Sequence, residues 1–389
     1  MTMEAGQGLP PSTDDTTDLA AQMRAARQAA GHSLAGMAAL THFSKPYLSL
    51  VETGRRTVTP EVVDRYQQVL GVPISTPQDP VRLTHEWLIG DRPTARHLAA
   101  GRRIGTTLIS KLEARVVELR HLDDTVSSAH LLPVVAAELD HAQQLTRQAS
   151  YPDQLGTRLL TVVGELSQLA GWVASDAGHY QQAQRLYLSG VTAAQAAADR
   201  ALGAQLLSSL AYQIANVGKR DDAVLIARSA VTGAPNATPL VRALLAERLA
   251  WAAARAHDAD TTRRALDAVD DAYTQRSDGI AEPEWVYWLD RAEIDVMAGR
   301  CLIELGHPAD AEPLLTRALA GYDNSHVREV ALYQTWLAEG YAKAGNLDAA
   351  RTTLDQARAA AHADSVRLRR RINAVTNLIN RRAGKRDAH

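Results

Sequence analysis

An internal repeat constrains the fold of this 389-residue chain more than any other feature. Four segments share a pattern in which four residues separate a Gly from an Ala, and an apolar residue follows four positions later. They are AGHYQQAQRLY, VGKRDDAVLIA, LGHPADAEPLL and AGNLDAARTTL, with glycines at Gly178, Gly218, Gly306 and Gly345, and a degenerate copy lies near Asp260 and Ala265. A period of about 40 residues is typical of stacked helix pairs, because one pair cannot bury its own apolar face.

The remaining apolar residues are also spaced as in helices. Ala and Leu recur at intervals of three and four residues, and no segment alternates convincingly with a period of two. We therefore predict an all-α protein in which stacked helix pairs form an α-solenoid over much of the chain.

Residues 32–56, near the N-terminus, read as two short helices joined by a tight turn. Ser33 and Ser44 are suited to cap the two helices, and Gly54 is suited to end the second. The expected buried residues are Leu34, Met37, Ala38 and Leu40 in the first helix, and Leu48 and Val51 in the second. Such a helix pair, followed by Arg55 and Arg56, is typical of domains whose second helix enters the major groove of DNA.

Residues 19–72 resemble the Cro/repressor-type (XRE) helix-turn-helix family. The matching residues are Met23, Arg27, Gly31, Ser33, Met37, Ala38, Ser44, Tyr47, Leu48, Ser49, Glu52, Gly54, Arg55, Pro60, Leu70, Gly71 and Val72. The resemblance implies double-stranded DNA as a partner and a recognition helix over residues 44–53. It also implies an interhelical ion pair between Arg27 and Glu52, so that Glu52 is part of the scaffold.

Carried over position by position, the resemblance assigns the DNA contacts. Ser44 begins the recognition helix, Lys45, Pro46, Ser49 and Leu50 face base edges, and Tyr47, Arg55 and Arg56 lie near phosphates. Leu34 and Leu50 depart from the family, which often has a Gln at the first position and a polar base reader at the second. Leu50 is suited to contact a thymine methyl group. The alternative is a degenerate helix, or one that is covered by a partner.

Composition restricts the classes of partner and compartment. Lys and Arg number 42 against 44 Asp and Glu, so DNA binding needs a local basic patch. Bases only slightly outnumber acids in residues 17–73, and one copy should bind DNA weakly, which favours a homodimer. The single Cys301 excludes an internal disulfide framework, and it is expected to be a buried apolar residue rather than a reactive thiol. Without a signal peptide or an apolar run of about 18 residues, the expectation is a soluble, cytoplasmic protein with no membrane partner.

The expected organisation follows from these patterns. It comprises a disordered tail (1–16), a helix-turn-helix domain (17–73), a Pro-rich linker (74–80), a helical connecting or dimerisation region (81–155), a repeat array (156–362) and a basic C-terminal helix and tail (363–389). In the first domain, Thr59, Pro60 and Glu61 predict the start of a helix that ends at Leu70.

The array resembles tetratricopeptide repeats, whose helix pairs carry small residues where they pack. Gly171 and Gly299 match the small position of the first helix, and Ala230, Ala318 and Ala357 match one of the second. The spacing indicates helices longer than in the standard 34-residue repeat.

Projection of the repeat places polar and aromatic side chains on the concave face. The expected ligand-binding residues are Glu165, Gln168, Trp172, Asp176, Gln205, Ser208, Tyr212, Asn216, Glu247, Glu293 and Arg300, with Glu339 in the last copy. Amides suit a peptide backbone, and the carboxylates favour a basic or amine-bearing ligand. The alternative is that these are solvated polar residues, with Trp172 and Tyr212 packed between helices.

Two further segments have two interpretations each. Trp285, Tyr287 and Trp288 form either a packed loop or the rim of a ligand site. The basic helix after residue 365 is either a cap on the array or a second surface for DNA or dimer contacts.

No catalytic motif, cofactor motif or metal-ligand spacing occurs, so we expect no enzyme, cofactor or metal. The layout resembles ligand-responsive regulators of actinobacteria and other Gram-positive bacteria. That resemblance implies a dimeric, sequence-specific transcriptional regulator that senses a small peptide or metabolite. The alternative is a scaffold whose array binds a partner protein and whose helix-turn-helix localises it to DNA.

Overall fold

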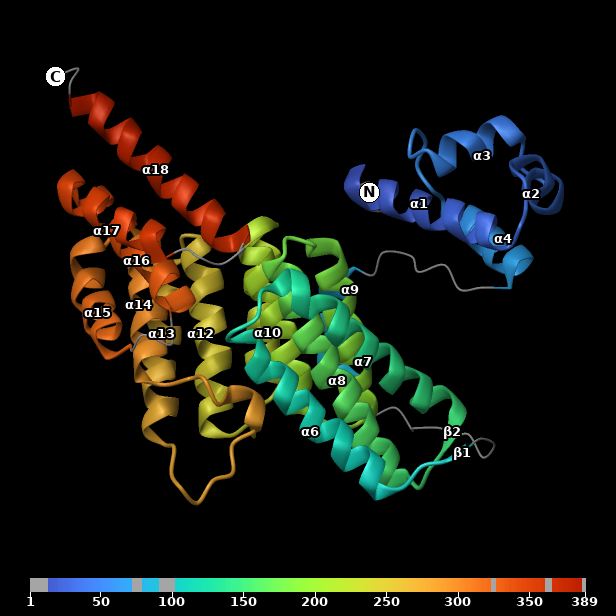
Figure 1. Cartoon of the computed structure of the whole chain (residues 1–389), viewed down its shortest axis with the longest axis horizontal. Coiled ribbons are helices and arrows are strands. Elements are labelled where there is room, and N and C mark those ends of the chain that lie inside the picture. The colour runs from blue at the N-terminus through green and yellow to red at the C-terminus, as the bar shows by residue number, and fades with distance from the viewer. Residues whose placement is uncertain (1–12, 72–78, 91–101, 323–326, 361–365, 387–389) are drawn as a thin grey trace, which may run out of the picture. The chain divides into compact units, whose positions relative to one another are not determined.

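The computed structural model describes residues 13–71, 79–90, 102–322, 327–360 and 366–386. The chain divides into two compact units, Met1–Asp79 and Pro80–His389. The first unit contains α1 (Thr13–Ala29), α2 (Leu34–Thr41), α3 (Lys45–Glu52) and α4 (Pro60–Leu70) (Figure 1). Most of the expected linker (74–80) and most of the expected N-terminal tail (1–16) lie outside the described residues, although α1 begins within the tail, at Thr13.

The four N-terminal helices pack around one apolar core. Met23, Met37, Leu48, Val51 and Tyr66 are fully buried in it. Two expectations need correction. Leu40 is 49% exposed, because it lies on the outer face of α2. Thr59 occupies the N-cap of α4, but its side chain makes no capping hydrogen bond.

The second unit is a helical stack. Its helices are α5 (Pro80–Ile89), α6 (Thr106–Asp123), α7 (Ser128–Gln148), α8 (Asp153–Asp176), α9 (Tyr180–Ala196), α10 (Arg200–Val217), α11 (Arg220–Gly233), α12 (Pro239–Arg255), α13 (Ala259–Thr274), η1 (Glu284–Val286), α14 (Arg291–Leu305), α15 (Pro308–Gly321), α16 (Val327–Ala344), α17 (Leu347–Ala360) and α18 (Val366–Arg386). Two-residue strands, β1 (Arg102–Arg103) and β2 (Ala149–Ser150), pair in parallel. The prediction of an all-α fold is confirmed: a helix-turn-helix unit precedes solenoid-like packing of helices.

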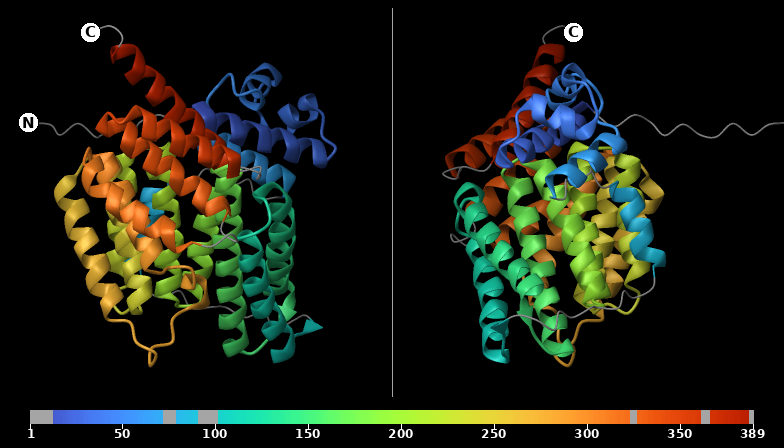
Figure 2. Two further views of the ribbon diagram at one scale, coloured as in Figure 1. Left: turned by 60° about the vertical axis from the view of Figure 1, so that its left-hand side comes forward. Right: turned by 90° about the vertical axis from the view of Figure 1, so that its right-hand side faces the viewer.

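Consecutive helices from α8 to α17 pack as pairs: α8 with α9, α10 with α11, α12 with α13, α14 with α15, and α16 with α17 (Figures 1 and 2). The small residues found in the sequence lie where these helices approach. A Cβ at Gly171 of α8 would lie 2.6 Å from the Tyr187 ring of α9, and one at Gly299 of α14 would lie 2.8 Å from Leu315 of α15. Any larger residue at either position would push the pair apart.

The turns within pairs explain three of the four repeated glycines, while Gly218 has φ −125°. Gly178, Gly306 and Gly345 all have φ near 88°, a conformation that residues with a Cβ adopt at a cost. The degenerate copy has His257 at the corresponding turn, with φ 59°. The chain therefore makes a turn with positive φ between α12 and α13 as well, although this copy has no glycine there.

Helices outside the repeat also pack on the stack. α18 packs on α16 and α17 (Figure 2), which favours the interpretation of the basic C-terminal helix as a cap. α5 packs on α9 and α11, where the buried Trp87 ring occupies the space left by Gly203 and Gly233. Over the described residues, no helix is long and apolar enough to cross a membrane.

Candidate functional site

The exposed side of α3 is the first candidate site. Ser44 accepts a hydrogen bond from Tyr47 N over 3.3 Å, so its hydroxyl caps the helix as expected. The side chains that the sequence assigns to base edges, Lys45, Pro46, Ser49 and Leu50, are all exposed. Leu50 is 40% exposed.

Residues beside α3 form a basic and aromatic margin. The Arg56 guanidinium lies 4.8 Å from the centroid of the half-buried Tyr47 ring, and that ring packs against Phe43. Arg55 and Arg56 are exposed after the turn at Gly54, which has φ 68°. Exposed guanidinium groups are the kind of side chain that contacts phosphates in protein–DNA complexes.

A buried polar network fixes the angle of α3. Arg27 of α1 donates two hydrogen bonds of 2.7 Å to the carboxylate of Glu52, and Tyr66 of α4 donates a third over 2.8 Å. The expected ion pair is therefore confirmed, and Glu52 belongs to the scaffold. Burial and the bond to Glu52 raise the pKa of Tyr66, which keeps the phenol in its donor form.

The second candidate site consists of two adjoining cavities in the helical stack. One has a volume of about 190 Å³ and lies among α6, α8, α10, α12, η1, α14, α16 and the start of α18. The other has a volume of about 260 Å³ and lies among α8, α10, α12, α14, α16 and α18. They share Trp172, Asp176, Tyr212, Arg300 and Arg367. Together they reach the size of small-molecule sites, ~300–1,000 Å³.

Most of the residues predicted for the concave face line these cavities. Those in one or both are Gln168, Trp172, Asp176, Gln205, Tyr212, Asn216, Glu293 and Arg300. Glu165, Ser208 and Glu247 line neither: Glu165 binds Arg120, Ser208 donates to Gln205, and Glu247 is 1% exposed. Glu339 also lies outside both, since it pairs with Arg371 and Lys343.

The sequence did not point to many of the other lining residues. Arg120 and Asp123 come from α6, Arg248 from α12, Tyr333 and Trp336 from α16, and Arg367, Arg370 and Arg371 from α18. Trp285, Tyr287 and Trp288 line the smaller cavity, which favours the second of their two interpretations. The basic run in the last helix was a signal for the arginines, but its interpretation as a cap on the array did not place them in the cavities.

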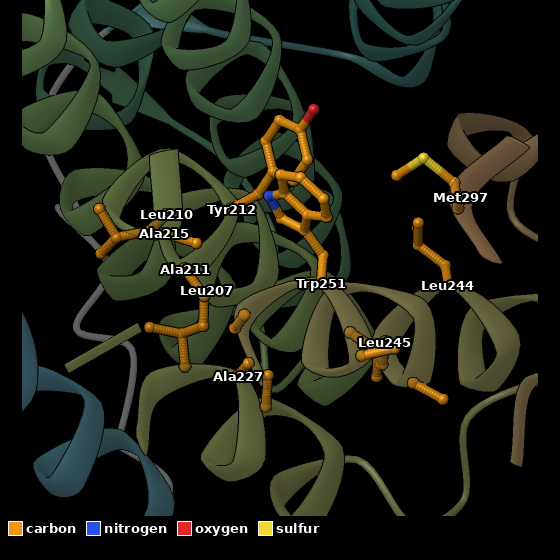
Figure 3. Close-up of a cluster of buried hydrophobic side chains, with 14 of the residues drawn as sticks. Leu207, Leu210, Ala211, Tyr212, Ala215, Ala227, Leu244, Leu245, Trp251 and Met297 are labelled. Atoms are coloured by element: carbon orange, nitrogen blue, oxygen red, sulfur yellow. The ribbon is translucent and has the colours of Figure 1, made fainter. Parts of the chain in front are cut away.

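The two cavities meet at Tyr212. Its phenol oxygen accepts hydrogen bonds from Arg300, over 2.9 Å, and from Arg367, over 2.6 Å. The Tyr212 and Trp251 rings lie side by side, 6.3 Å between centroids, with Met297 of α14 facing them (Figure 3). Burial by itself would raise the pKa of Tyr212, but the nearby arginine charges outweigh burial, so its pKa is lowered. A lowered phenol pKa is the mark of a positive potential at this point.

The single thiol of the chain lies in the interior of the second unit. Cys301 is 1% exposed, and burial raises the pKa of its thiol, as expected of a packed apolar residue. Among the described residues, no group of His, Cys, Asp and Glu side chains is arranged to hold a metal ion.

The fold and the exposed α3 define the class of the N-terminal unit, a helix-turn-helix DNA-binding domain. In agreement, residues 18–76 match the family model described as "Helix-turn-helix domain". No curated protein matches the chain. Among solved structures, the chain is similar to BtubC (BKLC) from P. vanneervenii, with 17% identity, 65% of this chain and 93% of that chain covered, and a TM-score of 0.42.

Proposed function

We propose that this protein is a sequence-specific transcriptional regulator of the XRE type. In this proposal, a homodimer presents two copies of α3 to DNA, and the tetratricopeptide-like array binds a small peptide or metabolite that changes the dimer geometry. A regulator accounts for both candidate sites without invoking catalysis.

One observation carries the DNA-binding half of the proposal. α3 exposes Lys45, Ser49 and Leu50 on one side, while Glu52 on its other side is anchored in the Arg27 and Tyr66 network. A recognition helix needs this combination of a free outer face and a fixed angle, because base contacts depend on its orientation in the groove.

The cavities support ligand sensing. They lie within the stack rather than on a flat outer surface, and several helices contribute to their walls. A ligand that contacts α8, α12, α14 and α18 together would favour one arrangement of these helices over another. Two recognition helices must lie about 34–36 Å apart to reach successive major grooves, so a modest change in dimer geometry would alter DNA affinity.

Fluorescence anisotropy with labelled DNA from upstream of the protein's own gene tests the DNA-binding half. Wild-type protein, Lys45→Glu and Arg55→Ala are titrated at several salt concentrations in the presence of random competitor DNA. We expect specific binding by the wild type and its loss in Lys45→Glu. Arg55→Ala should weaken binding to all sequences and reduce the salt slope by about one.

Arg263→Ala is the matched control, because Arg263 is exposed on α13 in the helical stack. It should leave both affinity and sequence preference unchanged. Equal, salt-sensitive binding of the wild type to every DNA would contradict sequence-specific reading, and the array would then be the functional half of the protein.

The rival function is a scaffold whose array binds a partner protein. Cavities of this size between the helices favour a small ligand over a protein surface. Pull-downs that recover a stoichiometric protein partner, together with DNA binding that is insensitive to small-molecule extracts, would favour the scaffold. Sedimentation velocity tests the proposed dimer directly.

A further inference from the structure

The wall shared by the two cavities concentrates positive charge in the interior. Arg300, Arg367 and Arg248 all approach Tyr212, with guanidinium carbons 5.6, 5.6 and 4.5 Å from its ring centroid. Arg300 is only 2% exposed. A buried guanidinium is costly unless an anion or several hydrogen bonds compensate it.

The hydrogen-bond partners of Arg300 are a phenol and a thioether. Its Nη groups donate to Tyr212 Oη, over 2.9 Å, and to Met297 Sδ, over 2.7 Å, while Nε has no hydrogen-bond partner. Its guanidinium lies 4.3 Å from the Trp251 centroid and 4.7 Å from the Trp336 centroid. Among the described residues, neither Arg300 nor Arg367 forms an ion pair with a carboxylate.

The acidic groups nearest to Arg300 do not replace such a partner. Glu247 has no hydrogen bond to either carboxylate oxygen, and burial raises its pKa. Glu293 accepts hydrogen bonds from Tyr322 and Tyr333, over 2.5 and 2.6 Å, and burial raises its pKa as well. Both shifts favour the neutral acid.

Three of the other arginines at the cavities are paired with carboxylates, and Asp123, Asp124 and Glu329 also line the smaller cavity. Arg120 binds Glu165 and Glu284, Arg255 binds Glu304, and Arg371 binds Glu339. Asp176 is the carboxylate that the two cavities share; it accepts a hydrogen bond from Ser128 and lies beyond ion-pair distance of Arg367. Arg248 lies 3.2 Å from Glu247, without hydrogen-bond geometry.

Aromatic rings supply flat apolar walls next to this charge. Trp172, Trp251 and Trp336 all line the larger cavity, and the Trp251 and Trp336 rings meet edge to face with centroids 5.4 Å apart. Guanidinium groups and rings therefore alternate around one space. Such walls accept a planar body, while the arginine donors have capacity for an oxyanion.

We propose that the adjoining cavities bind a small organic anion, with Arg300 and Arg367 holding its carboxylate or phosphate group and the tryptophans flanking a flat apolar body. This ligand class rests on the proposed function in one respect, that the array is the ligand-binding half. It reverses the preference for a basic or amine-bearing ligand that the sequence suggested, since Glu247 is buried and the Glu293 carboxylate is occupied by the hydroxyls of Tyr322 and Tyr333.

Isothermal titration calorimetry of the full chain, without DNA, tests the inference with one ring system bearing different head groups. The probes are 2-naphthoate, 2-naphthyl phosphate, neutral 2-naphthalenemethanol and cationic 2-naphthalenemethylamine. Because hydrogen bonds to charged groups contribute strongly, we expect the better anion to bind at least about tenfold more tightly than the alcohol. The amine should bind no better than the alcohol, and the ranking of the two anions distinguishes a carboxylate site from a phosphate site.

Substitutions of the two arginines test whether the anionic probes bind in the cavities. Arg300→Gln and Arg367→Gln should each reduce anion affinity by about tenfold while changing alcohol affinity by less than about twofold. Arg367 lies in the last helix and is half-buried, so it provides a second variant if Arg300→Gln does not fold. Arg263→Gln in α13 and Arg55→Gln in the N-terminal unit are matched controls that should bind the anions as the wild type does.

Two results would overturn the inference: equal or tighter binding of the alcohol or amine, or no binding of either anion below about 1 mM. Anion binding that is unaffected at Arg300 and Arg367 but lost at Arg55 would also overturn it. None of these outcomes bears on DNA recognition, which the anisotropy titration measures separately, so failure of this inference and failure of the proposed function are distinguishable.

Discussion

Arg300 donates a hydrogen bond of 2.9 Å to the phenol oxygen of Tyr212, although 88 residues separate them in the chain. Tyr212 comes from α10 and Arg300 from α14, so the bond joins two non-adjacent pairs of the stack across the space between the cavities. Arg367 of α18 donates to the same oxygen. One hydroxyl therefore connects the array to its C-terminal cap.

Removal of that hydroxyl should destabilise the second unit. In Tyr212→Phe, two buried guanidinium donors lose their acceptor while the ring packing is kept, with an expected cost of about 1–3 kcal/mol. All six tryptophans lie in the second unit, so urea unfolding followed by tryptophan fluorescence reports on this unit alone. Tyr273→Phe is the control, since the Tyr273 hydroxyl has no hydrogen bond among the described residues; an equal cost in both variants would refute the cross-link.

Glu52→Gln should unfold the N-terminal unit, although Glu52 is a scaffold residue and not one of the predicted DNA contacts. Glu52 is 5% exposed and accepts three hydrogen bonds, and the loss of one partner of a buried pair costs about 3–5 kcal/mol. Hydrogen exchange in α1–α4 should accelerate strongly, and DNA binding should be lost with it. Glu61→Gln, exposed in the first turn of α4, should cost less than about 1 kcal/mol. Slow exchange in Glu52→Gln would show that the network does not hold α3.

The contact between Arg371 and Glu339 predicts a pH dependence for the stability of the second unit. Burial by itself would raise the pKa of Glu339, but the charges of Arg371 and Lys343 outweigh it, so the pKa is lowered. The unfolded chain then binds the proton more readily. The stabilisation by ionised Glu339 is complete above its unfolded pKa of about 4.3 and disappears as the pH falls through the folded pKa.

Thermal unfolding of Glu339→Gln should therefore differ most from the wild type near neutral pH, and the gap should shrink as the pH falls. Glu86→Gln, which removes an exposed pair with Arg82, should show a small gap at every pH. A constant large gap for Glu339→Gln would contradict the ionic origin of this contact.

Gly171→Val should loosen the first helix pair of the array. A Cβ at Gly171 meets the fully buried Tyr187 ring at 2.6 Å, so the added side chain should cost about 1–3 kcal/mol by overpacking. Gly384→Val in α18, where nothing lies within 4 Å of a Cβ, should change the unfolding free energy by less than about 0.5 kcal/mol. Unchanged stability of Gly171→Val in urea would mean that this helix pair packs differently.

Much of the fold was predictable because its determinants are local. Ser33 and Ser44 cap helices through residues three positions away, and Gly178, Gly306 and Gly345 turn the chain between neighbouring helices. Leu40 shows the limit of such reasoning. Its spacing fits an apolar helix face, but which face is buried depends on where the other helices pack.

The sequence by itself determined the helix-turn-helix unit, the all-helical fold and most of the array side chains that were predicted for the ligand site and that line the cavities. Only the tertiary structure decided the charge of the cavities. Glu247 looked available, yet it is buried, while Arg120, Arg248 and Arg367 reach the same space from α6, α12 and α18. Helical periodicity orients side chains over a few turns, whereas the stacking of distant helices sets which charges meet and which of them remain uncompensated.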